Sequence, residues 1–356
     1  MTRSPLAAIA RTKSSRLACK RKKLSQLVSG YSGSLTRVGV AMALIYAFCD
    51  PIAHCVIGLP SRMPHFCNPR ASQNRDNGEG ATAMQLTFAG AGAAFTVGTD
   101  NYHSNMVLTV SVPSDSAPAG SRAGQRRMLI DCGSDARYSL PRIGIAGPAD
   151  LDAVYISHLH ADHVGGLEWL GLVSRYGVPK VRLTLFCADK VMPLLWDGSL
   201  VGGMGITEEG RATLSSYFDP QPVRGNRFSW SGIDFTLIPV AHVGHGDVLM
   251  QSFGLLFTIC GVRVYLTTDA KFDGDLLSKP YAQEADIIFH DCETGPPSGV
   301  HSHYADLCTL PAELRRKIWL YHYQPGPLPD ARGKGFRGMV VRGQCFDFTR
   351  PETLSG

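Results

Sequence analysis

The sequence predicts an α/β protein in which two mixed β-sheets pack against each other and helices cover their outer faces. Short apolar runs rich in β-forming residues recur through residues 84–356 and outnumber the candidate helices. Hydrophobic residues make up 44% of the 356-residue chain, which is enough to build one large core. No internal repeat is visible, so the pattern indicates one domain built from many short strands.

The candidate elements follow one another along the chain. Apolar residues at helical spacing predict a helix over 166–176, whereas Pro193 weakens a second helix candidate at 189–196. A modest Gly-rich insertion occupies 197–223. The expected strands cover residues 84–89, 105–112, 128–131, 151–157, 181–187, 233–240, 255–259, 262–267, 287–291 and 318–322.

Basic residues gather in the first 83 positions. These positions carry 12 of the 35 Lys and Arg residues and three of the 30 acidic ones. That leaves 23 basic and 27 acidic residues in 84–356, a net charge of −4. A mildly acidic body offers no polyanion-binding face, so we expect no stable nucleic-acid complex.

Residues 1–83 are predicted to lie outside the folded domain. Basic residues precede an apolar stretch at 38–49, an order similar to a secretory signal or a transit peptide. About a dozen apolar residues are too few to span a bilayer, and residues 59–83 have a linker composition. Two interpretations stay open: a basic, largely disordered targeting extension, or an upstream reading of a protein whose translation starts at Met84.

The ten cysteines are scattered, and none has the spacing of a metal-binding or redox pair. We expect reduced side chains, most of them buried or half-buried, in a cytoplasmic protein. Those within 84–356 are Cys132, Cys187, Cys260, Cys292, Cys308 and Cys345.

Four potential metal ligands fall within six residues, directly after the expected strand LDAVYIS. They are His158, His160, Asp162 and His163 in the segment HLHADH. Alternate side chains of an extended stretch point the same way, so His158 and His160 can reach one cation. Asp162 and His163 follow the turn and can face a second cation. Imidazole nitrogens combined with carboxylate oxygens are typical of a catalytic zinc site, and a solvated polar loop would not need three imidazoles.

Further ligands have to come from elsewhere in the chain, and three candidates stand at strand ends. His242 follows FTLIPVA, Asp269 follows VRVYLTT and His322 follows KIWLY. A rigid scaffold can aim such side chains at a common point. His245 and His303 lie close to the proposed positions in sequence and remain alternatives for a ligand or an acid.

With these residues in place, the sequence resembles the metallo-β-lactamase superfamily, whose hallmark is H-x-H-x-D-H followed by a distant His, a bridging Asp and a last His. The resemblance covers residues 84–356 and implies an αβ/βα sandwich that holds two Zn²⁺ ions per chain. It implies one ion held by His158, His160 and His242, a second held by Asp162, His163 and His322, and a bridge by Asp269. Asp131 in LIDCG would support a ligand imidazole by hydrogen bonding.

Other segments narrow the resemblance. Aspartate rather than cysteine at the bridging position favours the phosphodiesterase and thioesterase branches over antibiotic-cleaving lactamases. The segments IFHDCE and VHSHY resemble the ribonuclease Z branch, in which His301 would be the general acid and Asp291 would orient it. The tRNA-gripping arm of that branch has no evident counterpart here. Together with NYHSN and LPAELRRKIWLYHYQ, the insertion at 197–223 is most similar to the anti-Pycsar phosphodiesterases, which degrade cyclic nucleotides such as cyclic CMP and cyclic UMP.

We therefore expect a zinc-dependent phosphodiesterase that opens 3′,5′-cyclic nucleotides by attack of a hydroxide bridging the two ions. The expected catalytic residues are Asp162, Asp291 and His301, of which His301 supplies a proton to the departing oxygen. As partners we expect a small nucleotide and a second copy of the chain, and no membrane.

Three other functions stay open. A transfer-RNA 3′-processing nuclease would need a basic surface and salt-sensitive binding. The segment around His301 argues against a glyoxalase II-type thioester hydrolase. The complete ligand set argues against a nucleotide-binding protein that lacks catalysis, since a binder does not need paired metals.

Overall fold

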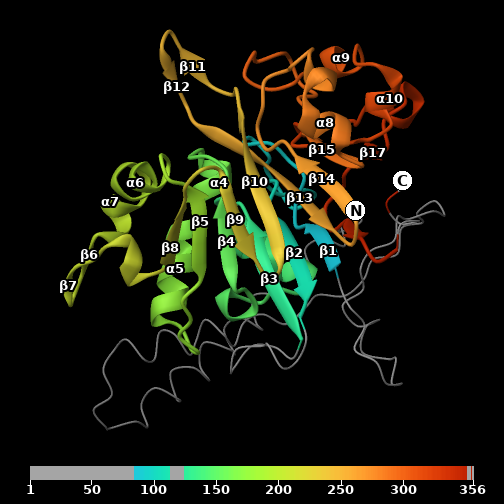
Figure 1. The fold of residues 1–356 in the computed structure, drawn as a ribbon. Helices are drawn as coiled ribbons and strands as arrows, with labels where there is room; N and C mark the ends of the chain where they lie inside the picture. The colour runs from blue at the N-terminus through green and yellow to red at the C-terminus, as the bar shows by residue number, and fades with distance from the viewer. Residues whose placement is uncertain (1–83, 113–123, 351–353, 355–356) are drawn as a thin grey trace, which may run out of the picture. The chain divides into compact units, whose positions relative to one another are not determined.

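The first of two seven-stranded mixed sheets gathers strands from both ends of the described chain, which comprises residues 84–112, 124–350 and 354 of the computed structural model (Figure 1). It contains β1 (Met84–Phe88), β2 (Met106–Ser111), β3 (Gln125–Ile130), β4 (Ala153–Ile156), β5 (Thr184–Ala188), β8 (Asp219–Val223) and β18 (Cys345–Asp347). Their order is β18-β1-β2-β3-β4-β5-β8, and the strands from β3 to β8 run parallel.

The second sheet uses strands from the other half of the chain. It contains β9 (Arg227–Trp230), β10 (Ile233–Val240), β13 (Ser252–Ile259), β14 (Val262–Leu266), β15 (Ile287–Asp291), β16 (Ile318–Tyr321) and β17 (Gly338–Met339). Their order is β17-β16-β15-β14-β13-β10-β9, and the strands from β14 to β17 run parallel. In each sheet, parallel strands therefore end together at one edge.

Helices and two hairpins fill the connections. The helices are α3 (Ala136–Ser139), α4 (Ala161–Val164), α5 (Leu167–Tyr176), α6 (Met192–Leu194), α7 (Val201–Met204), α8 (Pro280–Glu284), α9 (Tyr304–Leu307) and α10 (Ala312–Arg315). A π-helix at Leu195–Leu200 joins α6 to α7. The other short helical segments are 3-10 helices. One hairpin pairs β6 (Ile206–Thr207) with β7 (Gly210–Arg211), and the other pairs β11 (Gly244–His245) with β12 (Val248–Leu249).

Apolar faces of the two sheets meet in one hydrophobic core. Phe88 of β1 lies 5.3 Å from Phe289 of β15, measured between ring centroids, and 5.5 Å from Tyr321 of β16. The helix α5 shows the matching pattern, because its buried residues Leu167, Leu170, Gly171 and Ser174 recur at helical spacing. The expected α/β architecture of two mixed sheets flanked by helices is confirmed.

All ten expected strands are present, although β3, β5 and β13 each begin three residues away from their expected starts. The strand β8 lies inside the Gly-rich insertion and was not expected, because Pro220 and Pro222 argue against a strand. The backbone N–H of Asp219 donates to the carbonyl of Leu183, 2.9 Å away, so alternate residues face β5 and the two prolines face outward. An edge position tolerates proline, since no ladder hydrogen bond is needed there.

Two further expectations concern the cysteines and a membrane-spanning helix. The six cysteines of the described residues form no disulfide. Among the helices of this part of the chain, none is both long and apolar enough to cross a bilayer. The apolar stretch at 38–49 and the proposed extension 1–83 lie outside the described residues.

Candidate metal centre

The segment HLHADH follows the carboxyl end of β4, a fully buried strand at the centre of the first sheet. His158 and His160 lie in the extended stretch between β4 and α4, whereas Asp162 and His163 lie within the first turn of α4. The change from extended to helical backbone inside the segment lets its four polar side chains face two neighbouring points. This was the arrangement expected from the spacing.

The turn after β3 lies tightly against α4. A Cβ atom at Gly133 would lie 2.2 Å from the carbonyl oxygen of Asp162, and one at Gly166 would lie 2.4 Å from the carbonyl oxygen of Gly133. Only glycine allows this close approach of the two backbones. The short distance brings Asp131, which precedes the turn, next to the ligand segment.

Three strand ends turn through the left-handed region of backbone conformation. Asp131 has φ +59°, Thr268 has φ +55° and His322 has φ +62°. Such values are uncommon outside glycine, and strained residues of this kind cluster at functional sites. Each turn redirects the chain at the point where β3, β14 or β16 delivers a polar side chain.

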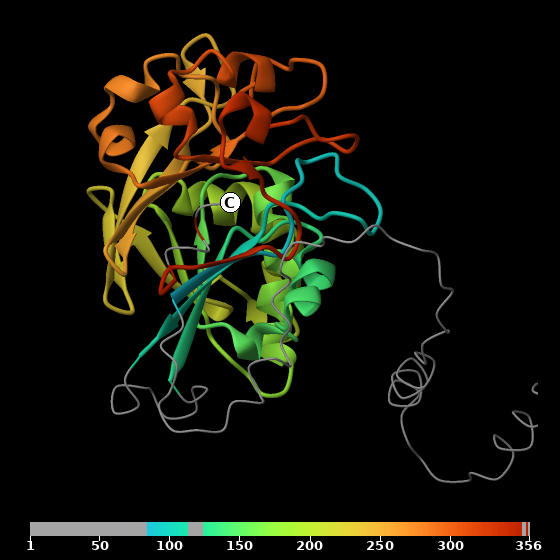
Figure 2. The same ribbon diagram turned by 90° about the vertical axis from the view of Figure 1, so that its right-hand side faces the viewer.

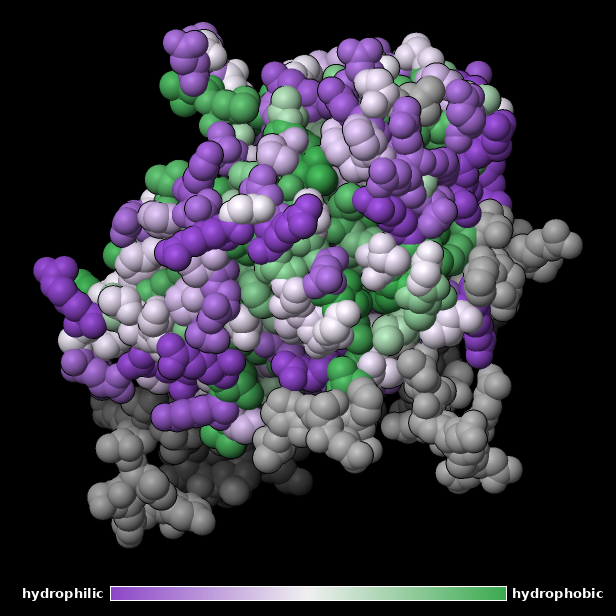
Figure 3. Space-filling view, viewed as in Figure 1, coloured by the Kyte–Doolittle hydropathy of each residue, from purple (hydrophilic) through white to green (hydrophobic). Residues whose placement is uncertain are grey.

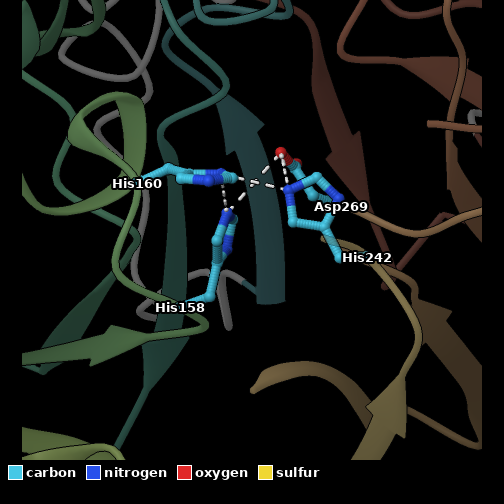
Figure 4. Close-up of side chains that lie close together, drawn as sticks. All are labelled: His158, His160, His242 and Asp269. Atoms are coloured by element: carbon cyan, nitrogen blue, oxygen red, sulfur yellow. Dashed lines mark hydrogen bonds and ion pairs between the residues drawn. The ribbon is translucent and has the colours of Figure 1, made fainter. Parts of the chain in front are cut away.

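Three imidazoles form the first ligand set, defined as His158, His160 and His242, and they converge with the carboxylate of Asp269 (Figure 4). The Nδ1 atom of His160 lies 3.0 Å from the Nε2 atom of His158 and 3.0 Å from the Nε2 atom of His242. Both Nε2 atoms lie 3.7 Å from the Oδ2 atom of Asp269. The ring nitrogens thus surround one point.

The second ligand set, defined as Asp162, His163 and His322, surrounds a neighbouring point. The Oδ2 atom of Asp162 lies 3.2 Å from the Nε2 atom of His163 and 3.1 Å from the Nε2 atom of His322. Asp269 reaches this set as well, because its Oδ2 atom lies 3.2 Å from His163 Nε2 and its Oδ1 atom 3.3 Å from His322 Nε2. Asp269 therefore lies between the two sets.

Hydrogen bonds behind the imidazoles fix which nitrogen faces inward. The Nδ1 atom of His163 donates to Asp131 Oδ2 at 2.8 Å, and that of His242 donates to the carbonyl of Val300 at 2.9 Å. Ser157 Oγ donates to Asp131 Oδ2 at 2.9 Å and accepts from His158 Nδ1 at 3.0 Å. With each Nδ1 acting as the donor, each Nε2 presents a lone pair to the centre, as a metal ligand requires.

Buried atoms of the proposed ligands lack hydrogen-bond partners in the part of the chain that the structure describes. Six of the seven side chains are buried, and His160 is half-buried. Within the described residues, neither the Nε2 atom of His163 nor the Oδ1 atom of Asp269 has a hydrogen-bond partner. Leaving a buried polar group without a hydrogen bond costs about 1–3 kcal/mol. A bound cation would give both atoms a partner, so these residues fit a metal site. Nitrogen and carboxylate oxygen donors are those that zinc accepts.

The electrostatics of the second ligand set also favour positive charge. Burial acts to lower the pKa of His163, yet the carboxylates of Asp269, Asp162 and Asp131 raise it well above its ordinary value. The pKa of His322 is likewise raised, because burial is outweighed by Asp269 and by hydrogen bonds to Asp162 and Asp291. A site that draws protons onto imidazoles has an excess of negative potential, which a divalent cation would neutralise.

His301 and Asp291 adjoin the second ligand set. The Nδ1 atom of His301 donates to Asp291 Oδ2 at 2.8 Å, so its Nε2 atom remains for another partner. The ring of His301 lies 5.0 Å from that of His322 and 4.9 Å from that of His242, measured between centroids. Asp291 also lies 3.3 Å from His322 Nδ1 and accepts from the backbone N–H of Ala270. One carboxylate thus holds both His301 and the loop after Asp269.

The two alternative histidines lie elsewhere. His303 caps α9, because its Nδ1 atom accepts from the backbone N–H of Ala305 at 3.3 Å, and its Nε2 atom donates to the carbonyl of Gly295 at 3.1 Å. His245 is exposed on the hairpin β11–β12, which Figure 3 shows projecting from the molecule. Neither joins a group of converging ligand atoms among the described residues.

Sequence reasoning missed two supports of the centre. Ser157 directly precedes His158, and its position at the end of a buried strand was the available signal. The carbonyl of Val300 carries no signal in its residue type, because any residue supplies a carbonyl. Both contacts orient ligand imidazoles.

Known proteins resemble this chain in sequence. The family model of the anti-Pycsar protein Apyc1 matches residues 84–346. An anti-Pycsar protein Apyc1 of Bacillus phage 010DV004 is 31% identical over 67% of this chain and 89% of its own length. One from Paenibacillus harenae is 35% identical over 55% of this chain and 78% of its own length.

Solved structures resemble the chain in fold. The metallo-β-lactamase fold protein YhfI from Bacillus subtilis has a TM-score of 0.53 and 16% identity, covering 75% of this chain and 99% of that protein. Zn²⁺-bound PqqB from Methylobacterium extorquens has a TM-score of 0.51 and 15% identity, covering 74% of this chain and 100% of that protein. The expected metallo-β-lactamase fold is confirmed.

Proposed function

The chain belongs to the family of the anti-Pycsar protein Apyc1, and from this premise we propose that it hydrolyses 3′,5′-cyclic nucleotides in a zinc-dependent reaction. Family and fold together make it a metal-dependent hydrolase. The proposal adds the metal, the substrate class and the roles of individual residues.

One observation carries the proposal: Asp269 lies between two sets of buried ligands, with His301 held beside them by Asp291. Two adjacent cation sites and a hydrogen-bonded imidazole are what hydrolysis of a phosphodiester needs, because the reaction requires charge neutralisation, a nucleophile and a proton donor. A protein that only bound nucleotides would need none of these together.

In this proposal the first ligand set would hold one zinc ion and the second ligand set the other, and Asp269, which lies between the two sets, would be available to both. When bound, the ions supply a water molecule of lowered pKa and neutralise charge on the phosphate oxygens. Asp131, Ser157 and the carbonyl of Val300 keep the Nε2 atoms of three ligands directed at the centre. The separate convergence of the two sets supports two ions rather than one.

His301 serves as the general acid in this proposal. Its Nδ1 atom donates to Asp291 Oδ2. Burial acts to lower the pKa of His301, but the hydrogen bond to Asp291 raises it, so the imidazolium form carries a second, transferable proton on Nε2. As water adds to phosphorus and the bond to the 3′-oxygen breaks, that oxygen takes the proton from Nε2. The product is a 5′-nucleotide. Asp291 keeps the imidazole in the required orientation.

The substrate is proposed to be a free nucleotide. The mildly acidic body does not favour a polyanion, and the insertion at 197–223 folds into short helices, the β6–β7 hairpin and β8, without a long arm. We further propose a cytoplasmic homodimer, for which light scattering of the purified protein would show twice the chain mass.

The test offers purified protein cyclic CMP, cyclic UMP, cyclic AMP, a precursor transfer RNA and a glutathione thioester, each with and without chelator. We expect 5′-nucleotides from the cyclic nucleotides, loss of activity on chelation and recovery with Zn²⁺. Cleavage of the RNA or the thioester alone would overturn the proposal. Elemental analysis showing well under one metal per chain after zinc is supplied would overturn the metal assignment.

A further inference from the structure

A cavity of about 530 Å³ has Tyr323, the residue after the ligand His322, in its wall. Its walls come from three segments that are distant in sequence: the loop at 96–101 between β1 and β2, the segment 323–328 after β16, and residues 341–342 after β17. All three follow the same ends of their strands as the ligand residues do. Figure 2 shows the β1–β2 loop (cyan) beside the segment after β16 (red).

Backbone hydrogen bonds join this cavity to a ligand residue. The carbonyl of Ala91 accepts from the N–H groups of His322 at 2.8 Å and Tyr323 at 3.2 Å, and the N–H of Ala93 donates to the carbonyl of Tyr323 at 3.0 Å. Tyr323 lines the cavity and directly follows His322. One wall of the cavity is therefore continuous, along the chain, with a residue of the second ligand set.

A side chain joins the cavity to the segment that carries His301. The Oε1 atom of Gln324 accepts from the backbone N–H groups of Thr294 at 2.6 Å and Gly295 at 3.0 Å. Since Gln324 also lines the cavity, its wall is fixed relative to the segment that leads to His301. The short stretch from Thr294 to His301 therefore connects the cavity wall to the proposed proton donor.

The lining combines apolar walls with opposite charges. Val97, Pro325 and Leu328 are apolar, whereas Asp100 and Arg342 carry charge. Arg342 is anchored, because its guanidinium donates to the carbonyl of Thr99 and lies 5.7 Å from the centroid of the Tyr102 ring. Asp100 has no hydrogen bond or ion pair with the other described residues, so its carboxylate is available to a ligand.

We propose that this cavity receives the base of the nucleotide substrate, an inference that rests on the function proposed above. A base is a flat heterocycle with donors and acceptors on its edge, and it suits a pocket with apolar walls and a few fixed polar groups. The carboxylate of Asp100 accepts from an exocyclic amine such as N4 of cytosine, and Arg342 donates to a ring acceptor. The phosphate then lies at the metal centre.

Two other regions suit the base less well. A second cavity, of about 300 Å³, lies among residues 174–182, 209 and 216–217, and none of its lining residues is a proposed ligand or follows one. The hairpin β11–β12 follows His242, but its Val248 and Leu249 are exposed. The cavity after His322 has two advantages. Its wall directly follows a ligand residue, and its lining is both polar and apolar.

The first experiment maps the base by photolabelling with 8-azidoadenosine 3′,5′-cyclic phosphate on the full-length, zinc-loaded His301→Ala variant, whose expected slow turnover keeps the probe intact. Irradiation is followed by proteolysis and mass spectrometry. We expect the label on peptides containing residues 96–101, 323–328 or 341–342, and protection by excess cyclic AMP. Protectable label confined to the hairpin at 244–249, or absent from the three cavity segments, would overturn the inference.

The second experiment tests selectivity at the edge of the base. Asp100→Ala should reduce the ratio of kcat/KM for cyclic CMP to that for cyclic UMP at least about fivefold, because only cytosine offers an exocyclic amine. Asp100→Asn should restore part of the ratio, since its amide oxygen still accepts. A structural role for Asp100 would leave the ratio unchanged, and an unchanged ratio would contradict the inference.

The third experiment partly fills the cavity. Leu328 is 40% exposed, so Leu328→Trp should fold, and we expect KM for cyclic CMP to rise on the order of tenfold. The rise should be much smaller for methyl p-nitrophenyl phosphate, a diester without a base. Ile206→Trp, on the distant β6 and 83% exposed, is the matched control and should leave both substrates unaffected. Equal changes on both substrates for Leu328→Trp would argue against base binding.

The outcomes separate the two proposals. Wild-type protein that hydrolyses methyl p-nitrophenyl phosphate but no cyclic nucleotide would overturn the proposed function and the base site with it. Wild-type protein that hydrolyses cyclic nucleotides while the Asp100 and Leu328 variants keep its selectivity and KM would overturn the base site alone.

Discussion

The two ligand sets share Asp269 but differ in what stands behind them. In the first set, His158 and His242 are supported by the neutral Ser157 hydroxyl and the Val300 carbonyl. In the second set, His163 is supported by the carboxylate of Asp131, and His322 lies 3.3 Å from that of Asp291. The second set also contains a carboxylate of its own, Asp162.

This difference shows up in the proton affinities of the imidazoles. Burial lowers the pKa values of His158, His160 and His242, whereas the carboxylates around His163 and His322 raise theirs despite burial. The second set therefore attracts positive charge more strongly. We infer that its cation binds more tightly, because Asp162 adds a carboxylate ligand, while the first set, in which His160 is half-buried, exchanges its cation more readily.

Removal of the shared bridge is the most severe test of the comparison. Asp269→Ala should abolish both sites, and activity should fall by about 10⁴-fold or more, because residues that act as one unit fail together. Elemental analysis and turnover of a cyclic nucleotide and of an activated nitrophenyl diester provide the measurement. Retention of one tightly bound zinc ion would instead mean that the second set stands alone.

Removal of the proton donor should spare both ligand sets. His301→Ala is expected to retain two metals and to lose about 10²–10⁴-fold of the turnover of cyclic nucleotides, whose leaving group needs a proton. On the nitrophenyl diester, which departs without protonation, the loss should be much smaller. Equal losses on both substrates would indicate a positioning role, and loss of metal would make His301 a ligand, as its proximity to Asp269 and Asp291 allows.

A matched pair of supports sharpens the contrast between charged and neutral backing. Asp131→Asn should weaken one zinc site by about 10–100-fold, because the charge behind His163 is lost. Ser157→Ala removes only a neutral hydroxyl behind His158 and should have a smaller effect. Competition with a chromogenic chelator measures both affinities. A larger effect of Ser157→Ala would reverse the order that we assign to the two sets.

The smallest effect is expected from removing residues 1–83. Both ligand sets, their supports and the family match lie within 84–356. A protein beginning at Met84 should bind two metals and keep the kcat/KM of the full chain within about twofold, because no group of the centre is lost. Insolubility or inactivity of the shorter protein beside an active full chain would contradict this.

The sequence predicted the centre well where ligands follow strongly apolar strands. His242, Asp269 and His322 each come after such a run, and the structure brings their side chains together with the HLHADH segment. These signals are local, so a single sequence contains them. The Val300 carbonyl and the helix-capping role of His303 depend on tertiary neighbours, which spacing along the chain does not reveal.

The base cavity and β8 were unpredictable for different reasons. The cavity forms from three short loops whose proximity depends on the order of strands in two sheets. In β8, the local preference of two prolines against a strand is overridden by its position beside β5. A residue with low strand propensity can therefore occupy a strand when it lies at a sheet edge that tolerates it.

The same prolines have a consequence for behaviour at high concentration. A sheet edge with free amide hydrogens invites a strand from another molecule and can seed fibrils. Along the outer side of β8, Pro220 and Pro222 stand where those hydrogens would be. A second molecule therefore finds no donors at these two positions, and the first sheet is protected at this end against intermolecular extension. Two residues that disfavour strand formation thus limit edge-to-edge aggregation at β8.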